Sequence, residues 1–74
     1  MSRLPVLSGR EVVRALERIG YVRDRQRGSH IVLRATTSPH RRIVVPDHDE
    51  VARGTLRAIV RQAGLSVEQF LTLL

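Results

Sequence analysis

Cysteine is absent from this sequence of 74 residues, and aromatic residues make up only 3% of it. Without cysteine, disulfide bonds, thiolate zinc sites and cysteine nucleophiles are excluded. The aromatic residues are Tyr21 and Phe70, and Phe70 lies in an apolar pattern expected of a core residue. Proteins that read single-stranded bases by stacking need exposed aromatic side chains, so this mode of nucleic-acid recognition is disfavoured.

Long apolar runs are also missing, since none approaches the roughly 18 residues needed to span a membrane. The apolar residues around Pro5 are too few for the core of a signal peptide. We therefore expect a cytoplasmic protein with no membrane partner. The length permits one domain over residues 1–74, with residues 1–7 as a lead-in. Because so small a domain buries a modest fraction of its surface, a partner protein is the expected external source of stability.

Lysine is absent as well, so the 13 basic residues are all arginines, against seven acidic residues and a formal net charge of +6. The planar guanidinium group suits bidentate contacts with phosphate, whereas lysine acts as a point charge. A GC-rich genome would explain arginine in place of lysine, but it would not explain the net charge. A small domain this basic indicates a polyanionic partner, and nucleic acid is the usual one.

Capping boxes and apolar spacing predict the helices. Ser8 and Glu11 form a capping box, and the apolar residues that follow recur at helical spacing up to Gly20, which predicts a helix over Ser8–Ile19. A second long helix carries Leu56, Ile59, Val60 and Ala63 and ends at Gly64. Ser66 and Gln69 form another capping box, which predicts a short last helix.

The segment between the long helices has a period of two, which is typical of strands. It predicts strands over Tyr21–Gln26, Ser29–Ala35 and Arg42–Val45, joined by a turn at Arg27–Gly28 and a loop over residues 36–41. The fold class is therefore α+β: helix, three-stranded antiparallel sheet, helix, short C-terminal helix. One face of such a sheet packs on the helices and the other stays free.

Arginines follow a regular pattern on this predicted fold. Arg23, Arg25 and Arg27 alternate along the first strand, which places them on one face. On the two long helices the arginines recur every four residues, at Arg10, Arg14 and Arg18 and again at Arg53, Arg57 and Arg61. A solvated charged surface would account for any single stripe. Together with the net charge, the stripes favour a footprint for the nucleic-acid backbone.

Few side chains in this sequence can exchange protons at neutral pH, and His30 is the best placed of them. Alternation puts His30 with Val32 and Arg34 on the face opposite Ile31 and Leu33, away from the core. An exposed histidine among arginines can take a proton from a ribose 2′-hydroxyl while the arginines stabilise the phosphate. An inert surface histidine is the alternative. Neighbouring strand residues point to opposite faces, so Ser29 and His30 are not expected to form a nucleophile–base pair.

A metal centre is not expected. Residues 46–50 gather Asp47, His48, Asp49 and Glu50, but a metal site needs ligands that converge from more than one element. A solvated loop leading into a helix is the simpler interpretation, since acidic residues ahead of a helix favour its dipole. His40 lies in the arginine-rich loop and is interpreted as a surface residue. No cofactor is predicted.

At Gly28-Ser29-His30 the sequence resembles a known family, the HicA toxins. The resemblance covers about Leu7 to Leu74 and rests on motifs at matching separations: Gly20-Tyr21, Arg27-Gly28-Ser29-His30, Pro46 with His48, Gly54-Thr55-Leu56-Arg57, and Ala63-Gly64-Leu65-Ser66. It implies a fold like the double-stranded-RNA-binding domain. It also implies a toxin of a toxin–antitoxin pair that cleaves mRNA and is neutralised by a HicB-type antitoxin covering the active site.

The resemblance also assigns residues. His30 is then the catalytic residue of the endoribonuclease, and an accessory role for His48 stays open. The exposed histidine and the lack of a predicted metal site favour a metal-independent reaction. The RNA-binding residues expected around His30 are Arg23, Arg25, Arg27, Gly28, Ser29 and Arg34. Oligomers are expected to form mainly through the antitoxin complex. Two alternatives remain: a non-catalytic RNA-binding module in which His30 is incidental, and an interaction protein whose basic surface docks an acidic antitoxin.

Overall fold

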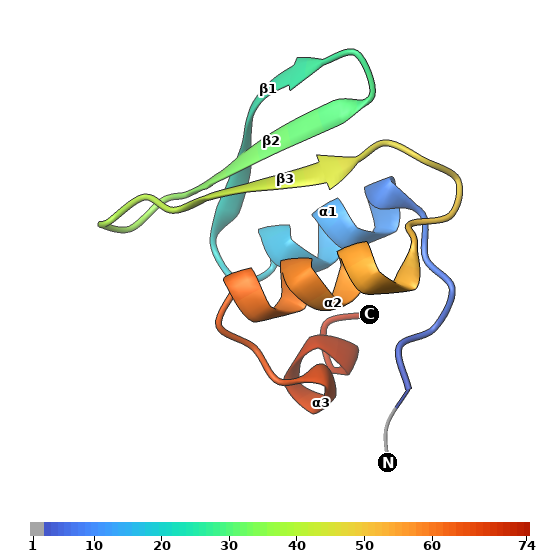
Figure 1. The fold of residues 1–74 in the computed structure, drawn as a ribbon. Helices are drawn as coiled ribbons and strands as arrows, with labels where there is room; N and C mark the ends of the chain where they lie inside the picture. Colours follow the sequence, from blue (N-terminus) through green and yellow to red (C-terminus); the bar gives the residue numbers. More distant parts are fainter. Residues whose placement is uncertain (1–2) are drawn as a thin grey trace.

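The computed structural model describes residues 3–74, and its elements follow the predicted order (Figure 1). They are α1 (Gly9–Glu17), β1 (Tyr21–Arg27), β2 (His30–Ala35), β3 (Arg42–Pro46), α2 (Arg53–Gln62) and α3 (Val67–Leu71). The predicted α+β class is therefore confirmed. The strands were predicted to within one residue at each end, with β3 extending to include Pro46.

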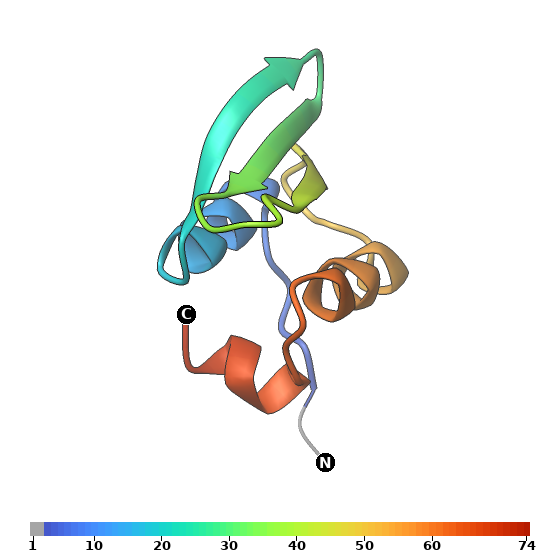
Figure 2. The same cartoon turned by 90° about the vertical axis from the view of Figure 1, so that its left-hand side faces the viewer.

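The three strands form one antiparallel sheet in the order β1-β2-β3. Helices α1 and α2 lie side by side under one face of this sheet, and α3 lies beyond them on the side away from the strands (Figures 1 and 2). Ile31 and Leu33 of β2 and Ile43 and Val45 of β3 point toward the helices and are at most 1% exposed. The opposite face is covered by no element within residues 3–74, and we call it the free face.

The hydrophobic core lies between the sheet and the helices and reaches down to α3. Phe70 is the largest fully buried side chain, and it joins α3 to a core that includes Leu16 of α1 and Leu56 of α2. Burying an apolar side chain of this size stabilises the fold by roughly 1.5–3 kcal/mol relative to leaving it exposed. Two of the five residues of α3 belong to the core, Phe70 fully buried and Val67 partly buried.

Both predicted capping boxes are confirmed. Glu11 N donates to Ser8 Oγ over 3.2 Å, and Ser8 N donates to Glu11 Oε1 over 2.9 Å. The equivalent bonds of the second box are from Gln69 N to Ser66 Oγ over 3.0 Å and from Ser66 N to Gln69 Oε1 over 2.8 Å. The predicted end of the first helix was two residues too far along the chain, because α1 ends at Glu17. Ile19 lies in the following turn and is 39% exposed, so it contributes less to the core than the helical spacing suggested.

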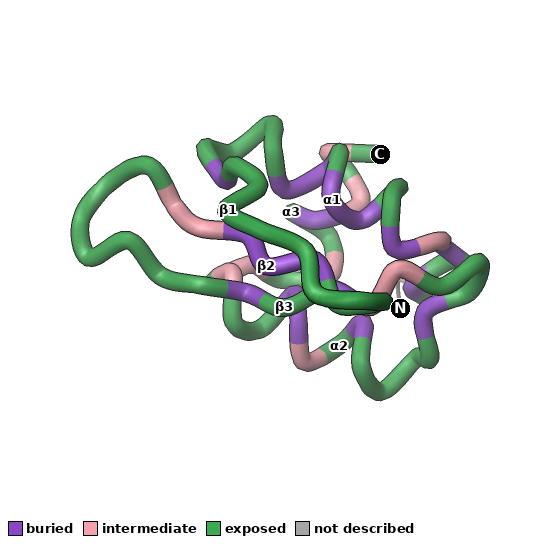
Figure 3. Tube along the Cα trace, turned by 90° about the horizontal axis from the view of Figure 1, so that it is seen from above, coloured by how far each residue is buried: buried purple, intermediate pink, exposed green. Residues whose placement is uncertain are grey.

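A β-bulge in β1 overturns the prediction that Arg23, Arg25 and Arg27 share one face. Arg23 pairs with Leu33 and Arg25 pairs with Val32, so one residue of β1, Asp24, has no partner in β2. Directly opposed residues of an antiparallel pair lie on the same face. Arg25 therefore lies on the free face, whereas Arg23 lies on the helix-facing side at the exposed edge of the sheet. Figure 3, viewed from above the sheet, shows β1 exposed along most of its length.

Candidate active site

His30 is the first residue of β2, and its side chain is exposed on the free face. Its partner in β1 is Arg27 and its partner in β3 is Pro46. Val32, two residues further along, lies on the same face but is only 8% exposed, because Arg25 and Val44 flank it in the neighbouring strands. The predicted orientation of His30, away from the core, is therefore confirmed.

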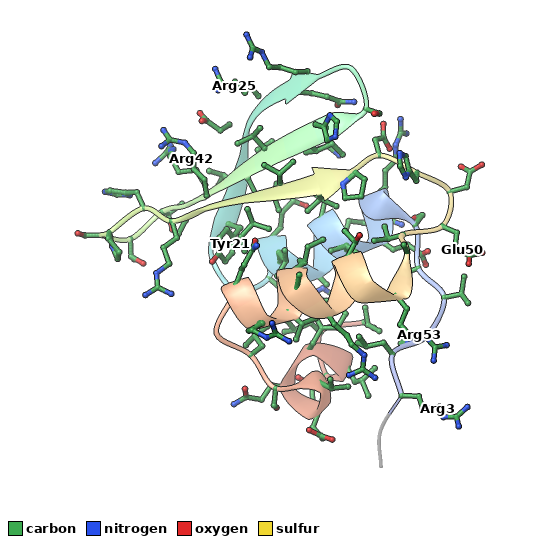
Figure 4. All side chains as sticks on the ribbon, in the orientation of Figure 1. Arg3, Tyr21, Arg25, Arg42, Glu50 and Arg53 are labelled. Carbon is green, nitrogen blue, oxygen red and sulfur yellow. The ribbon has the colours of Figure 1, made fainter. Side chains whose placement is uncertain are left out.

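Arginines share the free face with His30, and Arg27 is its direct partner. Arg27 and Arg25 lie on β1, and Arg34 on β2 is paired with Arg42 on β3. Figure 4 shows Arg25 and Arg42 on the side of the sheet away from the helices. Arg42 is held by an ion pair, in which its Nε lies 3.4 Å from Oδ2 of the bulge residue Asp24. The free face thus presents a positively charged sheet surface next to an imidazole.

The turn that precedes His30 has a conformation set by glycine. Gly28 has φ of +54°, a left-handed conformation that side-chain-bearing residues rarely adopt. Its carbonyl oxygen accepts a hydrogen bond from Gln26 Nε2 over 3.0 Å. Ser29 contributes its carbonyl oxygen, which accepts from Asp47 N over 2.6 Å. Gly28 and Ser29 therefore shape the turn, and no hydrogen bond between Ser29 and His30 is seen within residues 3–74.

His30 and His48 line the same hollow. It has a volume of about 330 Å³ and lies where β3 passes into the loop that leads to α2; its lining residues are His30, Val44, Pro46, His48, Ala52 and Thr55. The two histidines are 18 positions apart in the chain and come from different segments. The pairing of His30 with Pro46 brings them together, since His48 follows Pro46 by two residues.

The start of α2 faces this hollow through Ala52 and Thr55. Ala52 is the N-cap residue, and no side chain caps the helix there. The first turn of α2 also contains no acidic residue. The unbonded N–H groups and the positive end of the helix dipole favour an anion such as phosphate.

Residues 9–65 match the family model described as HicA toxin of bacterial toxin-antitoxin. This chain belongs to the HicA toxin family. The match covers α1, the whole sheet and α2, and it includes His30 and His48. A search of curated proteins returned no match.

Membership of the HicA family identifies the protein as the toxin of a toxin–antitoxin pair, and it implies an antitoxin partner. The helix–sheet–helix arrangement agrees with the fold like the double-stranded-RNA-binding domain that the resemblance implied. The resemblance covers about Leu7 to Leu74, and the family match covers residues 9–65 of that stretch. No helix within residues 3–74 is long and apolar enough to cross a membrane.

Asp47 is a residue of this HicA site that the sequence did not single out. Its carboxylate accepts from Gln26 Nε2 over 3.2 Å and lies 3.4 Å from Arg10 Nε. It therefore joins β1 and α1 to the segment between β3 and α2. In the sequence, Asp47 appeared as one of several acidic residues before a helix, and only the long-range contacts distinguish it.

Gly9 was also missed. It is the first residue of α1, and its N–H donates to the carbonyl oxygen of His48 over 2.9 Å. A methyl group at this position would overlap with the carbonyl oxygen of Pro46. Only glycine lets α1 approach the segment that carries His48 this closely. A glycine directly after a strong N-cap was the one available signal, because glycine has a low helix propensity.

The third histidine and the acidic residues after Pro46 do not line the hollow. His40 lies in the β2–β3 loop, and its Nδ1 is 3.1 Å from the carbonyl oxygen of Ala35. Within residues 3–74, no three His, Asp or Glu side chains gather into a group that would hold a metal ion. The acidic segment after Pro46 therefore has no converging ligands there, and metal independence of the activity stays a prediction.

Proposed function

We propose that this HicA-family toxin is a metal-independent endoribonuclease that cleaves mRNA, with His30 as the catalytic base. The observation that carries the proposal is the exposed imidazole of His30 in a hollow, on a sheet face that bears arginines. Imidazole exchanges protons near neutral pH, and arginine stays protonated and binds phosphate. A base next to fixed cations is what transfer of a phosphoryl group to a neighbouring hydroxyl requires.

In this proposal the RNA backbone lies across the free face. Arg25, Arg27 and Arg34 contact phosphates, and the turn at Gly28–Ser29 offers backbone groups close to His30. The uncapped start of α2 supports the same placement, since it favours phosphate at the hollow. Arg23 was expected in this set, but its place on the other side of β1 makes it a peripheral contact.

The proposed chemistry is an internal transesterification. His30 takes the proton of the 2′-hydroxyl, and the 2′-oxygen attacks the adjacent phosphorus. The bond to the 5′-oxygen breaks, which leaves a 2′,3′-cyclic phosphate on one fragment and a 5′-hydroxyl on the other. Arginines beside His30 stabilise the charge that develops on the phosphate oxygens. Products with 3′-hydroxyl and 5′-phosphate ends would contradict this chemistry.

The antitoxin is proposed to be of the HicB type and to cover the same face. Val22 and Val44 on this face are 37% and 48% exposed, and they lie among arginines. An apolar centre with a basic rim suits a partner that presents apolar and acidic residues. Val44→Asp should weaken antitoxin capture, whereas Val6→Asp, in the exposed lead-in, should not. Equal capture by both variants would place the antitoxin elsewhere.

The decisive experiment compares the wild-type protein with His30→Asn on a long single-stranded RNA, in EDTA and without ribosomes. His40→Asn is the matched control, because His40 lies outside the hollow and has φ of +57°, which asparagine tolerates. We expect cleavage by the wild type and by His40→Asn, and none by His30→Asn. Cleavage by all three would mean that the activity lies elsewhere.

Binding measurements distinguish the two remaining alternatives. If the wild type and His30→Asn bind RNA equally and neither cleaves it, the chain is a non-catalytic RNA-binding module. If the wild type fails to bind RNA but binds the antitoxin, the basic surface serves docking alone.

A further inference from the structure

A second imidazole lies in the hollow that contains His30. Its six lining residues include three that are apolar, one threonine and the two histidines. Threonine holds its proton far too tightly to exchange it at neutral pH, and so does arginine on the surrounding surface. His30 and His48 are therefore the groups of this hollow that can exchange protons during a reaction.

Main-chain hydrogen bonds hold the segments that carry the two histidines in fixed positions. Asp47 N donates to Ser29 O over 2.6 Å, so the residues immediately ahead of His48 and His30 are bonded to each other. The carbonyl oxygen of His48 accepts from Gly9 N over 2.9 Å, which ties His48 to the start of α1. These bonds involve main-chain atoms only. The side chain of His48 can thus be replaced without removing the bonds that hold its segment.

The proposed cleavage needs two proton transfers at different oxygens. A base removes the proton from the 2′-hydroxyl, and the 5′-oxygen that leaves must gain a proton or depart as an alkoxide. In an in-line displacement the attacking and leaving oxygens lie on opposite sides of the phosphorus. One imidazole cannot reach both, so a second group is required on the far side of the phosphate.

We propose that His48 is the general acid of this reaction, a second catalytic residue that protonates the leaving 5′-oxygen. This inference rests on the proposed ribonuclease function. His30 gains the 2′-hydroxyl proton as the bond from the 2′-oxygen to phosphorus forms. The bond from phosphorus to the 5′-oxygen breaks as His48 gives its proton to that oxygen. His30 leaves the step protonated and His48 neutral, and exchange with solvent restores both.

The test uses two RNA oligonucleotides that carry a cleavage site first mapped on a longer RNA. One has an ordinary phosphodiester at that site, and the other has sulfur in place of the bridging 5′-oxygen. A thiolate leaves without protonation, so the sulfur substrate has no need of a general acid. Single-turnover rates are measured for the wild type, His48→Ala and His30→Ala, with thermal unfolding of each variant as the check on folding.

We expect His48→Ala to cleave the oxygen substrate on the order of 10²- to 10⁴-fold more slowly than the wild type. On the sulfur substrate its rate should return to within a few-fold of the wild-type rate. His30→Ala should be slow on both substrates, because the 2′-hydroxyl still needs a base. A residue with a purely structural role would not recover its rate when only the leaving atom is changed.

Three outcomes would overturn the proposal, and they can be told apart. If His48→Ala remains as slow on the sulfur substrate as on the oxygen substrate, His48 is not the proton donor, while the ribonuclease function stands. If sulfur restores His30→Ala instead, the two roles are reversed. A wild-type protein that cleaves neither the longer RNA nor these oligonucleotides overturns both this assignment and the proposed function.

Discussion

The main-chain N–H of Asp47 donates to the carbonyl oxygen of Ser29 over 2.6 Å, and this bond links the segments that carry the two histidines of the hollow. The carboxylate of Asp47 extends the link, since it contacts Gln26 of β1 and Arg10 of α1. The carboxylate is 22% exposed and the arginine 72% exposed, so the ion pair itself contributes little to stability. We expect the contacts of the Asp47 carboxylate to hold the turn before His30 in a fixed position relative to the segment before His48.

Replacement of Asp47 by alanine should reduce cleavage more than it reduces stability. The main-chain bond to Ser29 survives, but Gln26 and Arg10 lose their shared acceptor. A small displacement of a catalytic group can cost up to about 10²-fold in rate, so we expect a loss on the order of 10- to 10²-fold. The free energy of unfolding should fall by about 1 kcal/mol. Single-turnover rates and urea unfolding measure the two effects.

Asp49→Ala is the matched control for Asp47→Ala. It also removes one negative charge, two residues further along the chain, but the Asp49 carboxylate makes no ion pair within residues 3–74. Equal rates for the two variants would show that charge, rather than the contacts of Asp47, sets the activity.

Replacement of Gly9 by alanine should destabilise the fold. The added methyl group would overlap with the carbonyl oxygen of Pro46, so α1 must move away from the segment that carries His48. Overpacking of this kind typically costs about 1–3 kcal/mol. Urea unfolding gives the change in free energy.

Gly54→Ala is the control for Gly9→Ala, because Gly54 lies in α2 and no other element comes within 4 Å of the added methyl group. It should be neutral or stabilising, by up to about 1 kcal/mol, since alanine has the higher helix propensity. Destabilisation of equal size at both positions would contradict the close approach at Gly9.

The sequence predicted the local features of this fold well. Each capping box depends on residues three positions apart, so Ser8 with Glu11 and Ser66 with Gln69 could be recognised from spacing alone. Period-two alternation likewise placed His30 on the free face, because β2 is regular from end to end. Features whose cause lies within a few residues are the ones that a sequence reveals.

The bulge, the hollow and the contacts of Asp47 could not be predicted in the same way. Alternation assumes a regular strand, and the extra residue at Asp24 breaks that assumption for Arg23. The meeting of His30 and His48 depends on the register of β2 with β3. The roles of Gly9 and Asp47 depend on the packing of α1 against the end of β3. Neither a sequence motif nor the periodicity of apolar residues predicts that packing.

Arg25 and Arg23 offer a direct test of the bulge, since they are two residues apart on β1 but lie on different faces. Arg25→Ala should weaken RNA binding severalfold and lower the slope of log Kobs against log salt by about 0.7, as expected for one lost phosphate contact on a single strand. Arg23→Ala should have the smaller effect. Affinity is measured at several salt concentrations in a His30→Asn background, so that cleavage does not interfere. Equal losses would indicate that RNA wraps around the edge of the sheet.

The capping box of α1 should give the stability a defined dependence on pH. The hydrogen bond from Ser8 N lowers the pKa of Glu11 below its usual value, and the Ser8 hydroxyl and Arg14 lower it further. A carboxylate with a lowered pKa in the folded state stabilises the fold above its unfolded pKa, and this stabilisation is lost as pH falls through the folded value. Glu11→Gln keeps an acceptor oxygen but removes the charge. Its loss of stability relative to the wild type should therefore be constant near neutral pH and become smaller below about pH 4.

Gln69→Glu in the other capping box makes the opposite change and should introduce a similar pH dependence of stability. Thermal unfolding between neutral and acidic pH measures both, and a deficit of Glu11→Gln that is the same at every pH would show that the charge of Glu11 contributes nothing.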